Sequence, residues 1–144
     1  MLTSSRLLPA LLVKPSEVID TLTLPHNERH KRKFVFTCDG GTEVLLDLEK
    51  AVHMKHSDGL VTERGLILIQ AALEECLEIT SQNPARLLKL AWHIGNRHTP
   101  AEITETAIYI EYDHVLEQMV RGLGATATKV TKAFQPEEGA YHVH

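Results

Sequence analysis

The first half of the chain alternates between short runs of apolar and β-branched residues and short polar turns. A period of two is typical of strands that face a core on one side and solvent on the other. Asp39-Gly40 and Asp58-Gly59 are dipeptides of the kind that close hairpins. This half is therefore predicted to be a small, mostly antiparallel β domain. Its main strands are expected at residues 18–24, 33–37, 43–48 and 66–71.

In the second half the apolar pattern changes to a mixture of strand and helix periods. Asn83 followed by Pro84 is a helix start, with Asn as N-cap and Pro at the first helical position, and Gly95 is expected to end that helix. The predicted elements are strands at 76–80, around 103, at 107–112 and at 125–134, with helices at 83–95 and 113–123. This β-α-β-β-α-β order predicts a ferredoxin-like, four-stranded antiparallel sheet with both helices on one face.

These patterns indicate an α+β protein with three parts. Residues 1–73 form the β-rich domain, residues 74–134 form the ferredoxin-like domain, and residues 135–144 form a histidine-bearing tail. The hydrophobic fraction of 43% is sufficient for a packed core.

A charged segment at residues 26–33 interrupts the predicted strands of the first half. Its sequence, HNERHKRK, is expected to be a solvated loop. The alternative is that its basic residues dock an acidic partner.

The composition excludes several classes of protein. Fifteen basic and nineteen acidic residues give a net charge of −4, which argues against general binding to nucleic acid or to anionic membranes. The opening residues resemble a signal peptide only superficially, because Pro9 interrupts a short apolar run and no small-residue cleavage site follows. The two cysteines, Cys38 and Cys76, have no spacing typical of a disulfide framework or zinc knuckle. A reducing compartment, the cytoplasm, is expected.

Nine histidines are the unusual feature of the composition, and His114 is the first of them that we single out. Asp113 is a good N-cap for the second helix. The apolar stripe of that helix comprises Val115, Leu116, Met119 and Val120. His114 lies off this stripe, on the polar face with Gln118 and Arg121, so it should point toward solvent or a partner chain. The positive end of the helix dipole favours a neutral ring that can donate a lone pair to a metal. Taken alone, an exposed histidine is more often a solvated surface residue.

A second histidine cluster follows the first helix. It contains His93, Arg97 and His98. Cationic groups are favoured at the negative end of a helix, so a capping role is the preferred interpretation over metal ligation.

The chain ends in a third group, His142-Val143-His144. In an extended backbone both rings lie on one side, about 7 Å apart at their attachment points, within reach of one ion. Two imidazoles are a weak site, so tight binding needs a ligand from a folded surface, and His114 is best placed. In a two-fold dimer, two tails and two His114 side chains could surround a shared ion. Imidazole-rich ligation suits nickel, copper or zinc. The alternative is a frayed chain end.

Three blocks of the second half also carry a resemblance. They are WHIGNRH at 92–98, IEYDHVLEQM at 110–119 and AFQPEEGAYH at 133–142. Together and in this order they resemble the UreE family of urease accessory proteins, which are nickel metallochaperones. In the first half, only the β-rich layout is similar.

The resemblance implies an N-terminal domain that binds a peptide or partner and a C-terminal ferredoxin-like domain that binds metal. It also implies a cytoplasmic homodimer that delivers nickel to the urease apoprotein through the urease accessory GTPase complex. His114 matches the family's interfacial metal ligand, and His142 and His144 match the start of its histidine-bearing tail. The chain departs from members with long polyhistidine tails because it stops after these two.

The expected class is thus a nickel-binding delivery protein and not an enzyme. The alternatives are a histidine-ligated zinc or copper protein, or a small metalloenzyme of ferredoxin-like fold. A metalloenzyme would need three protein ligands beside an acid or base, and no His-Glu-x-x-His constellation occurs. An RNA-binding ferredoxin-like domain would need an aromatic and basic sheet surface, which this sequence lacks.

Overall fold

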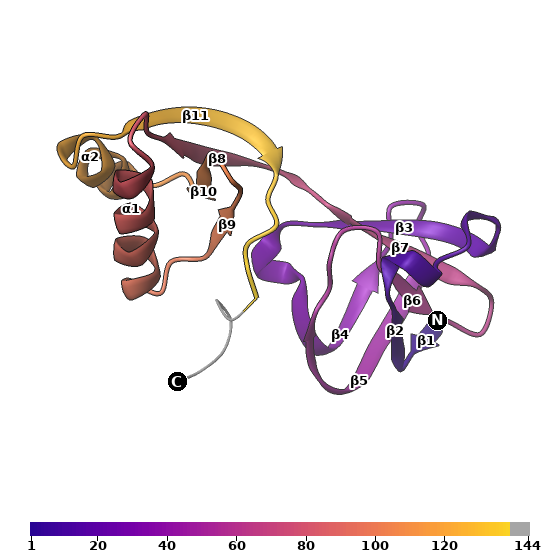
Figure 1. Cartoon of the computed structure of the whole chain (residues 1–144). Helices are drawn as coiled ribbons and strands as arrows, with labels where there is room; N and C mark the ends of the chain where they lie inside the picture. Colours follow the sequence, from indigo (N-terminus) through magenta and orange to yellow (C-terminus); the bar gives the residue numbers. More distant parts are fainter. Residues whose placement is uncertain (139–144) are drawn as a thin grey trace. The chain divides into compact units, whose positions relative to one another are not determined.

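The structure is a computed structural model that describes residues 1–138. The chain divides into two compact units, an N-terminal unit at Met1–Ala72 and a C-terminal unit at Leu73–His144. Figure 1 shows the strands of the N-terminal unit in indigo to magenta and the two helices of the C-terminal unit in red and orange tones.

The N-terminal unit is built from two sheets. The three-stranded sheet has the order β1-β5-β4 and the four-stranded sheet has the order β2-β6-β7-β3. The strands are β1 (Leu2–Ser4), β2 (Arg6–Leu8), β3 (Val18–Leu24), β4 (His30–Thr37), β5 (Glu43–His53), β6 (Gly59–Val61) and β7 (Leu66–Ala71), and short 3-10 turns lie at Ala10–Leu12, Pro15–Glu17 and His26–Glu28. The pairs β1–β5 and β3–β7 are parallel, and the other three pairs are antiparallel.

Alternating side chains of these strands form the core of the N-terminal unit. Its buried residues are Leu22, Leu24, Phe36, Cys38, Val44, Leu46, Leu48, Met54, Leu60, Ile67 and Ile69. The alternation is clearest in β5, where Val44, Leu46 and Leu48 are buried and their neighbours are more exposed. The apolar pattern therefore fixes which face of the strand is inside.

The turn between β4 and β5 is the predicted Asp-Gly hairpin. The Cys38 N–H donates to the Thr42 carbonyl over 2.7 Å, and Gly41 has φ = +95°, a conformation that glycine adopts at no steric cost. The Asp20 carboxylate of β3 accepts a hydrogen bond from the Gly40 N–H over 2.8 Å. Hydrogen bonding, first of all from Thr42, holds the pKa of Asp20 below its usual value.

The charged segment at residues 26–33 was predicted to be a loop, and this prediction was wrong. The segment forms the 3-10 turn His26–Glu28 and the beginning of β4, and Arg29 between them is fully buried. A guanidinium nitrogen of Arg29 donates to the Met54 carbonyl over 3.5 Å. Charge alone does not exclude a strand, because long basic side chains can extend into solvent while the backbone stays paired with the neighbouring strand.

The C-terminal unit has the predicted β-α-β-β-α-β order. Its elements are β8 (Leu73–Thr80), α1 (Pro84–Asn96), β9 (Ala101–Ile103), β10 (Ile108–Glu111), α2 (His114–Gly122) and β11 (Thr126–Ala133). The sheet order is β11-β8-β10-β9, with all three pairs antiparallel. Both helices lie on the same side of this sheet (Figure 1). The α+β class and the ferredoxin-like arrangement are therefore confirmed.

One hydrophobic cluster joins both helices to the sheet. Its buried residues are Leu77, Ile79, Leu90, Ile94, Ile108, Ile110, Leu116, Val120 and Ala127. α1 contributes Leu90 and Ile94, and α2 contributes Leu116 and Val120, in each case four residues apart. That spacing places each pair on one helical face, which packs on the sheet.

Helix α1 begins where the sequence predicts and ends later. The Asn83 side chain accepts a hydrogen bond from the Ala85 N–H over 3.0 Å, and Pro84 opens the helix. Gly95 was predicted to end the helix, but it lies inside it. The residue with left-handed backbone is His98, at φ = +57°, and its N–H donates to the Gly95 carbonyl. Glycine adopts the left-handed conformation more readily than histidine does. The residue types therefore pointed to Gly95 and not to His98.

Candidate metal centre

His114 is the first helical residue of α2. The Asp113 carboxylate accepts a hydrogen bond from the Leu116 N–H over 2.9 Å, which caps the helix as predicted. At the other end, Gly124 has φ = +86° and the Ala125 N–H donates back to the Val120 carbonyl, as in a Schellman motif. Both ends of the helix are thus fixed by local chemistry, so the orientation of its first turn is well defined.

The side chain of His114 faces away from the core. It is 70% exposed, as expected from its position off the apolar stripe. Leu116 and Val120 are buried, and Met119 is half-buried against the same core. Val115 was predicted to belong to this stripe, but it is 68% exposed. The buried face of the helix is therefore narrower than predicted, and Val115 is exposed beside His114.

Two polar side chains one helical turn away contact the imidazole of His114. Its Nδ1 lies 3.9 Å from a carboxylate oxygen of Glu117. Its Nε2 lies 3.3 Å from the amide nitrogen of Gln118. A ring that carries its proton on Nδ1 and accepts from Gln118 at Nε2 fits both contacts. A metal would then bind the lone pair of Nε2, which accepts the hydrogen bond from Gln118 in its absence. The ion can displace the Gln118 amide easily, because that amide is exposed to solvent.

Glu117 is held in place by its own neighbours. Its carboxylate accepts hydrogen bonds from Arg121 over 3.3 Å and from the Tyr112 hydroxyl over 3.1 Å. These bonds, that of Arg121 first, hold the pKa of Glu117 below its usual value. The bond to Glu117 raises the pKa of Tyr112. A fixed carboxylate therefore lies beside the His114 ring, at a distance from Nδ1 that is longer than a hydrogen bond.

The sequence pattern indicated His114 but not this supporting chain of Tyr112, Glu117 and Arg121. The signal was present in the spacing, because residues three and four apart on a helix are neighbours and Glu117 stands in that relation to both His114 and Arg121. Tyr112 comes from the segment that leads out of β10, so its contact with Glu117 depends on how strand and helix are joined.

The described residues do not complete a metal site around His114. Within residues 1–138, no three His, Cys, Asp or Glu side chains are grouped so that they could hold a metal ion. Burial raises the pKa of the thiols of Cys38 and Cys76 to about 11, so both are protonated at neutral pH in the metal-free chain. His142 and His144, the other predicted ligands, lie outside the described residues.

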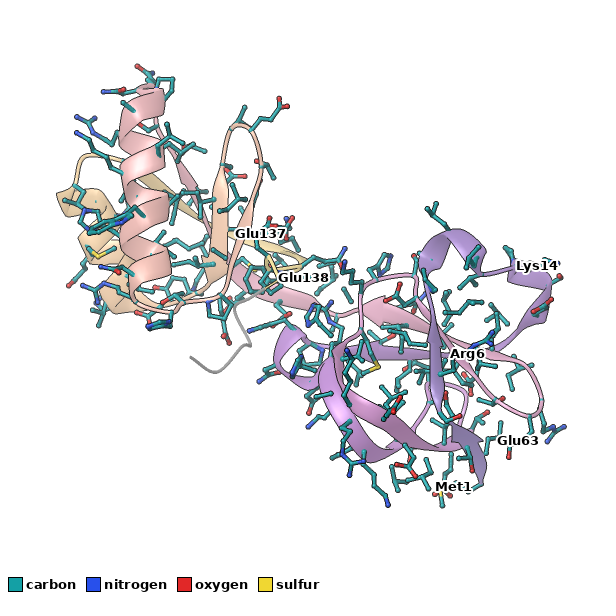
Figure 2. The ribbon with its side chains drawn as sticks, turned by 60° about the horizontal axis from the view of Figure 1, so that its bottom comes forward. Met1, Arg6, Lys14, Glu63, Glu137 and Glu138 are labelled. Carbon is teal, nitrogen blue, oxygen red and sulfur yellow. The ribbon has the colours of Figure 1, made fainter. Side chains whose placement is uncertain are left out.

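After β11, the chain runs along the opposite edge of the sheet. The Glu137 N–H donates to the Ala101 carbonyl over 2.7 Å, and the Glu137 carboxylate accepts from the Ile103 N–H over 3.0 Å. Both partners belong to β9, and Figure 2 shows the labelled Glu137 beside that part of the unit. The last described residues are therefore fastened to the domain that carries His114.

The second histidine cluster lies at the end of α1. His93 is exposed in the last turn, with its ring 5.1 Å from that of Trp92 in an edge-on arrangement. His98 is the left-handed residue after the helix. This position agrees with the preferred interpretation of the cluster as a helix end.

No helix in the described part of the chain is long and apolar enough to span a bilayer.

Asp113→Ala is expected to destabilise the C-terminal unit by about 1 kcal/mol, because the Leu116 N–H loses its only side-chain acceptor. The measurement is urea unfolding followed by circular dichroism. Glu105→Ala, an exposed change in the loop between β9 and β10, is the control and should have no effect. Equal midpoints for the two variants would contradict the capping role.

Comparisons with known proteins cover both units. The model of the UreE urease accessory protein N-terminal domain matches residues 5–72, and that of its C-terminal domain matches residues 74–144. A urease accessory protein UreE from Azorhizobium caulinodans is 53% identical over 98% of this chain and 68% of its own length. Proteins of the same name from Chelativorans sp. and Rhizobium rhizogenes are 45% and 48% identical, over 94% and 90% of this chain and 86% and 78% of theirs. The resemblance seen in the sequence is thus confirmed, and the chain belongs to the UreE family of urease accessory proteins.

Proposed function

We propose that this chain is a nickel metallochaperone, which binds nickel through histidines at a homodimer interface and delivers it for assembly of the urease metallocentre. The observation that carries the proposal is His114, an exposed and oriented imidazole in a chain of the UreE family. Nickel is the cargo. The partners we expect are the urease apoprotein and the urease accessory GTPase complex, in the cytoplasm, with no catalysis by the chain itself.

A shared site between two chains explains how one imidazole becomes a tight ligand. In a two-fold dimer the same patch meets itself, so two His114 rings approach one ion together. Val115 supports this arrangement, because an exposed valine beside the ligand is covered when the two patches meet. His142 and His144 of each tail complete the ligand set, and burial of the ion among four or more imidazoles favours nickel, copper or zinc over magnesium or calcium.

The two units then have separate tasks. The C-terminal unit holds the metal, and the N-terminal unit, with its two sheets, binds a peptide or partner protein. Residues 135–144 supply the tail ligands. A fixed carboxylate at Glu117 orients His114 in each chain and lowers the cost of ordering the ring when the ion binds.

Two measurements test the function. Equilibrium dialysis against nickel, with zinc and copper in parallel, measures metal binding, and light scattering measures the mass of the particle. The expected result is nickel binding by a particle with the mass of two chains. Val115→Arg should shift that mass toward one chain and weaken nickel binding, because two guanidinium groups would meet at the interface. Leu12→Arg, a comparably exposed apolar position in the N-terminal unit, is the matched control and should keep both properties. A full-length protein that neither dimerises nor binds nickel would overturn the proposal.

A further inference from the structure

A second pair of histidines lies in the N-terminal unit, where β4 begins and β5 ends. His30 is the first residue of β4, and His53 is the last residue of β5. The antiparallel register places them directly opposite each other. Nothing in the function proposed above uses either side chain.

The hydrogen-bond pattern brings these two side chains as close as a sheet allows. The Met54 N–H donates to the Arg29 carbonyl over 2.7 Å, so a backbone hydrogen bond joins the residues next to His30 and His53. Pairs alternate along an antiparallel ladder, and His30 and His53 therefore occupy a non-hydrogen-bonded position. Opposite residues at such positions have Cα atoms about 4.5 Å apart, which is the closer of the two spacings.

The rings already face each other. Their centroids are 6.4 Å apart and their planes are inclined by 32°. Two imidazoles that share one ion at metal–nitrogen distances of about 2.0–2.1 Å have centroids roughly 5–6 Å apart. A small rotation of each side chain is enough to close the difference, and no movement of the backbone is needed.

The surroundings hold the pair in place. Nδ1 of both rings is buried, so a metal ion shared by the two rings would bind them at Nε2. On one side of the pair, the fully buried Arg29 and Met54 anchor the two strands.

From this juxtaposition we propose that His30 and His53 form a two-imidazole site for a nickel, copper or zinc ion, separate from His114. Imidazole nitrogen is a preferred ligand of all three ions, and water fills their other coordination positions. Two protein ligands make a weak and readily exchanged site. The inference does not depend on the function proposed for the C-terminal unit.

The test uses the full-length chain with His114, His142 and His144 all changed to alanine, so that the site of the proposed function is removed. Copper(II) is the probe, because it binds a given nitrogen site more tightly than nickel or zinc does. Paramagnetic copper broadens the ring-proton signals of nearby histidines in a nuclear magnetic resonance titration. The signals of His30 and His53 should broaden together at the lowest copper concentration, before those of the other histidines.

Single substitutions then measure the contribution of each ligand. His30→Phe and His53→Phe keep a ring in the sheet and should each weaken copper binding about tenfold or more, since even outer partners of metal ligands are worth that much. The double variant should lose little more than either single variant, because a chelate fails when one ligand is lost. His93→Phe, at an exposed position of α1, is the control and should change nothing.

His30→Gln is the second variant, for the case in which phenylalanine disturbs the strand. Broadening of His30 without His53, or copper affinity unchanged in both His30 variants, would overturn the proposal. Failure of nickel binding by the unmodified chain would count against the function proposed for His114, whereas paired broadening in the triple-alanine chain would still support this site.

Discussion

His114→Ala is expected to remove most of the high-affinity nickel binding of this chain while leaving its fold intact. The side chain is 70% exposed, and it contacts Glu117 and Gln118 on its own helix. Its loss should therefore change the free energy of unfolding by less than about 0.5 kcal/mol. The substitution also removes the one ligand of the proposed site that a folded element positions. Nickel affinity should therefore fall by about 10- to 100-fold or more. Equilibrium dialysis beside urea unfolding measures both effects.

The control for this variant is His93→Ala, which also removes an exposed histidine from a helix of the same unit. It should bind nickel like the parent chain. A well-folded His114→Ala protein with an unchanged binding isotherm would show that the tail or another histidine carries the site.

Mixed dimers test whether the site bridges two chains. A dimer of one normal chain and one His114→Ala chain should have a damaged site, because a bridging ion needs both rings. Calorimetry that finds half of the sites at full affinity in such dimers would contradict bridging and indicate one independent site per chain.

The features that the sequence predicted correctly depend on residues close together in the chain. Asn83 and Asp113 each act within one helical turn, as N-caps, so their types were sufficient. The order β-α-β-β-α-β follows from the same local periods, and a ferredoxin-like sheet follows from that order. The exposure of His114 was likewise visible, because position relative to an apolar stripe is a property of the helix alone.

The features that the sequence did not predict depend on residues far apart. The parallel pairs β1–β5 and β3–β7 join strands that are not neighbours in sequence, and no turn between them signals the pairing. The pairing of His30 with His53 depends on a shift in register between Lys31 and Lys33, and such a bulge leaves no clear pattern in the chain. The exposure of Val115 depends on how the whole of α2 lies on its sheet. A hydrophobic residue at the edge of a stripe can fall on either side of that boundary.

Leu90→Ala and Leu88→Ala form a matched pair on α1 with very different expected costs. Leu90 is 1% exposed within the cluster that joins both helices to the sheet, whereas Leu88 is 74% exposed. Removing a buried leucine side chain leaves a cavity and costs about 2–5 kcal/mol. Removing the exposed one should change the free energy of unfolding by less than about 0.5 kcal/mol. The result follows from burial alone, because residue type and helix are the same.

Circular dichroism provides the measurement. Both described α-helices lie in the C-terminal unit, so the helical signal in a urea titration reports unfolding of that unit. The Leu90→Ala midpoint should fall well below that of Leu88→Ala, and equal midpoints would contradict the packing described here. The loss should also reach the proposed metal centre, because Leu116 of the capped first turn packs into the same cluster. Nickel that binds only the folded unit should then raise the Leu90→Ala midpoint by mass action, and it should do so less when His114 is also alanine.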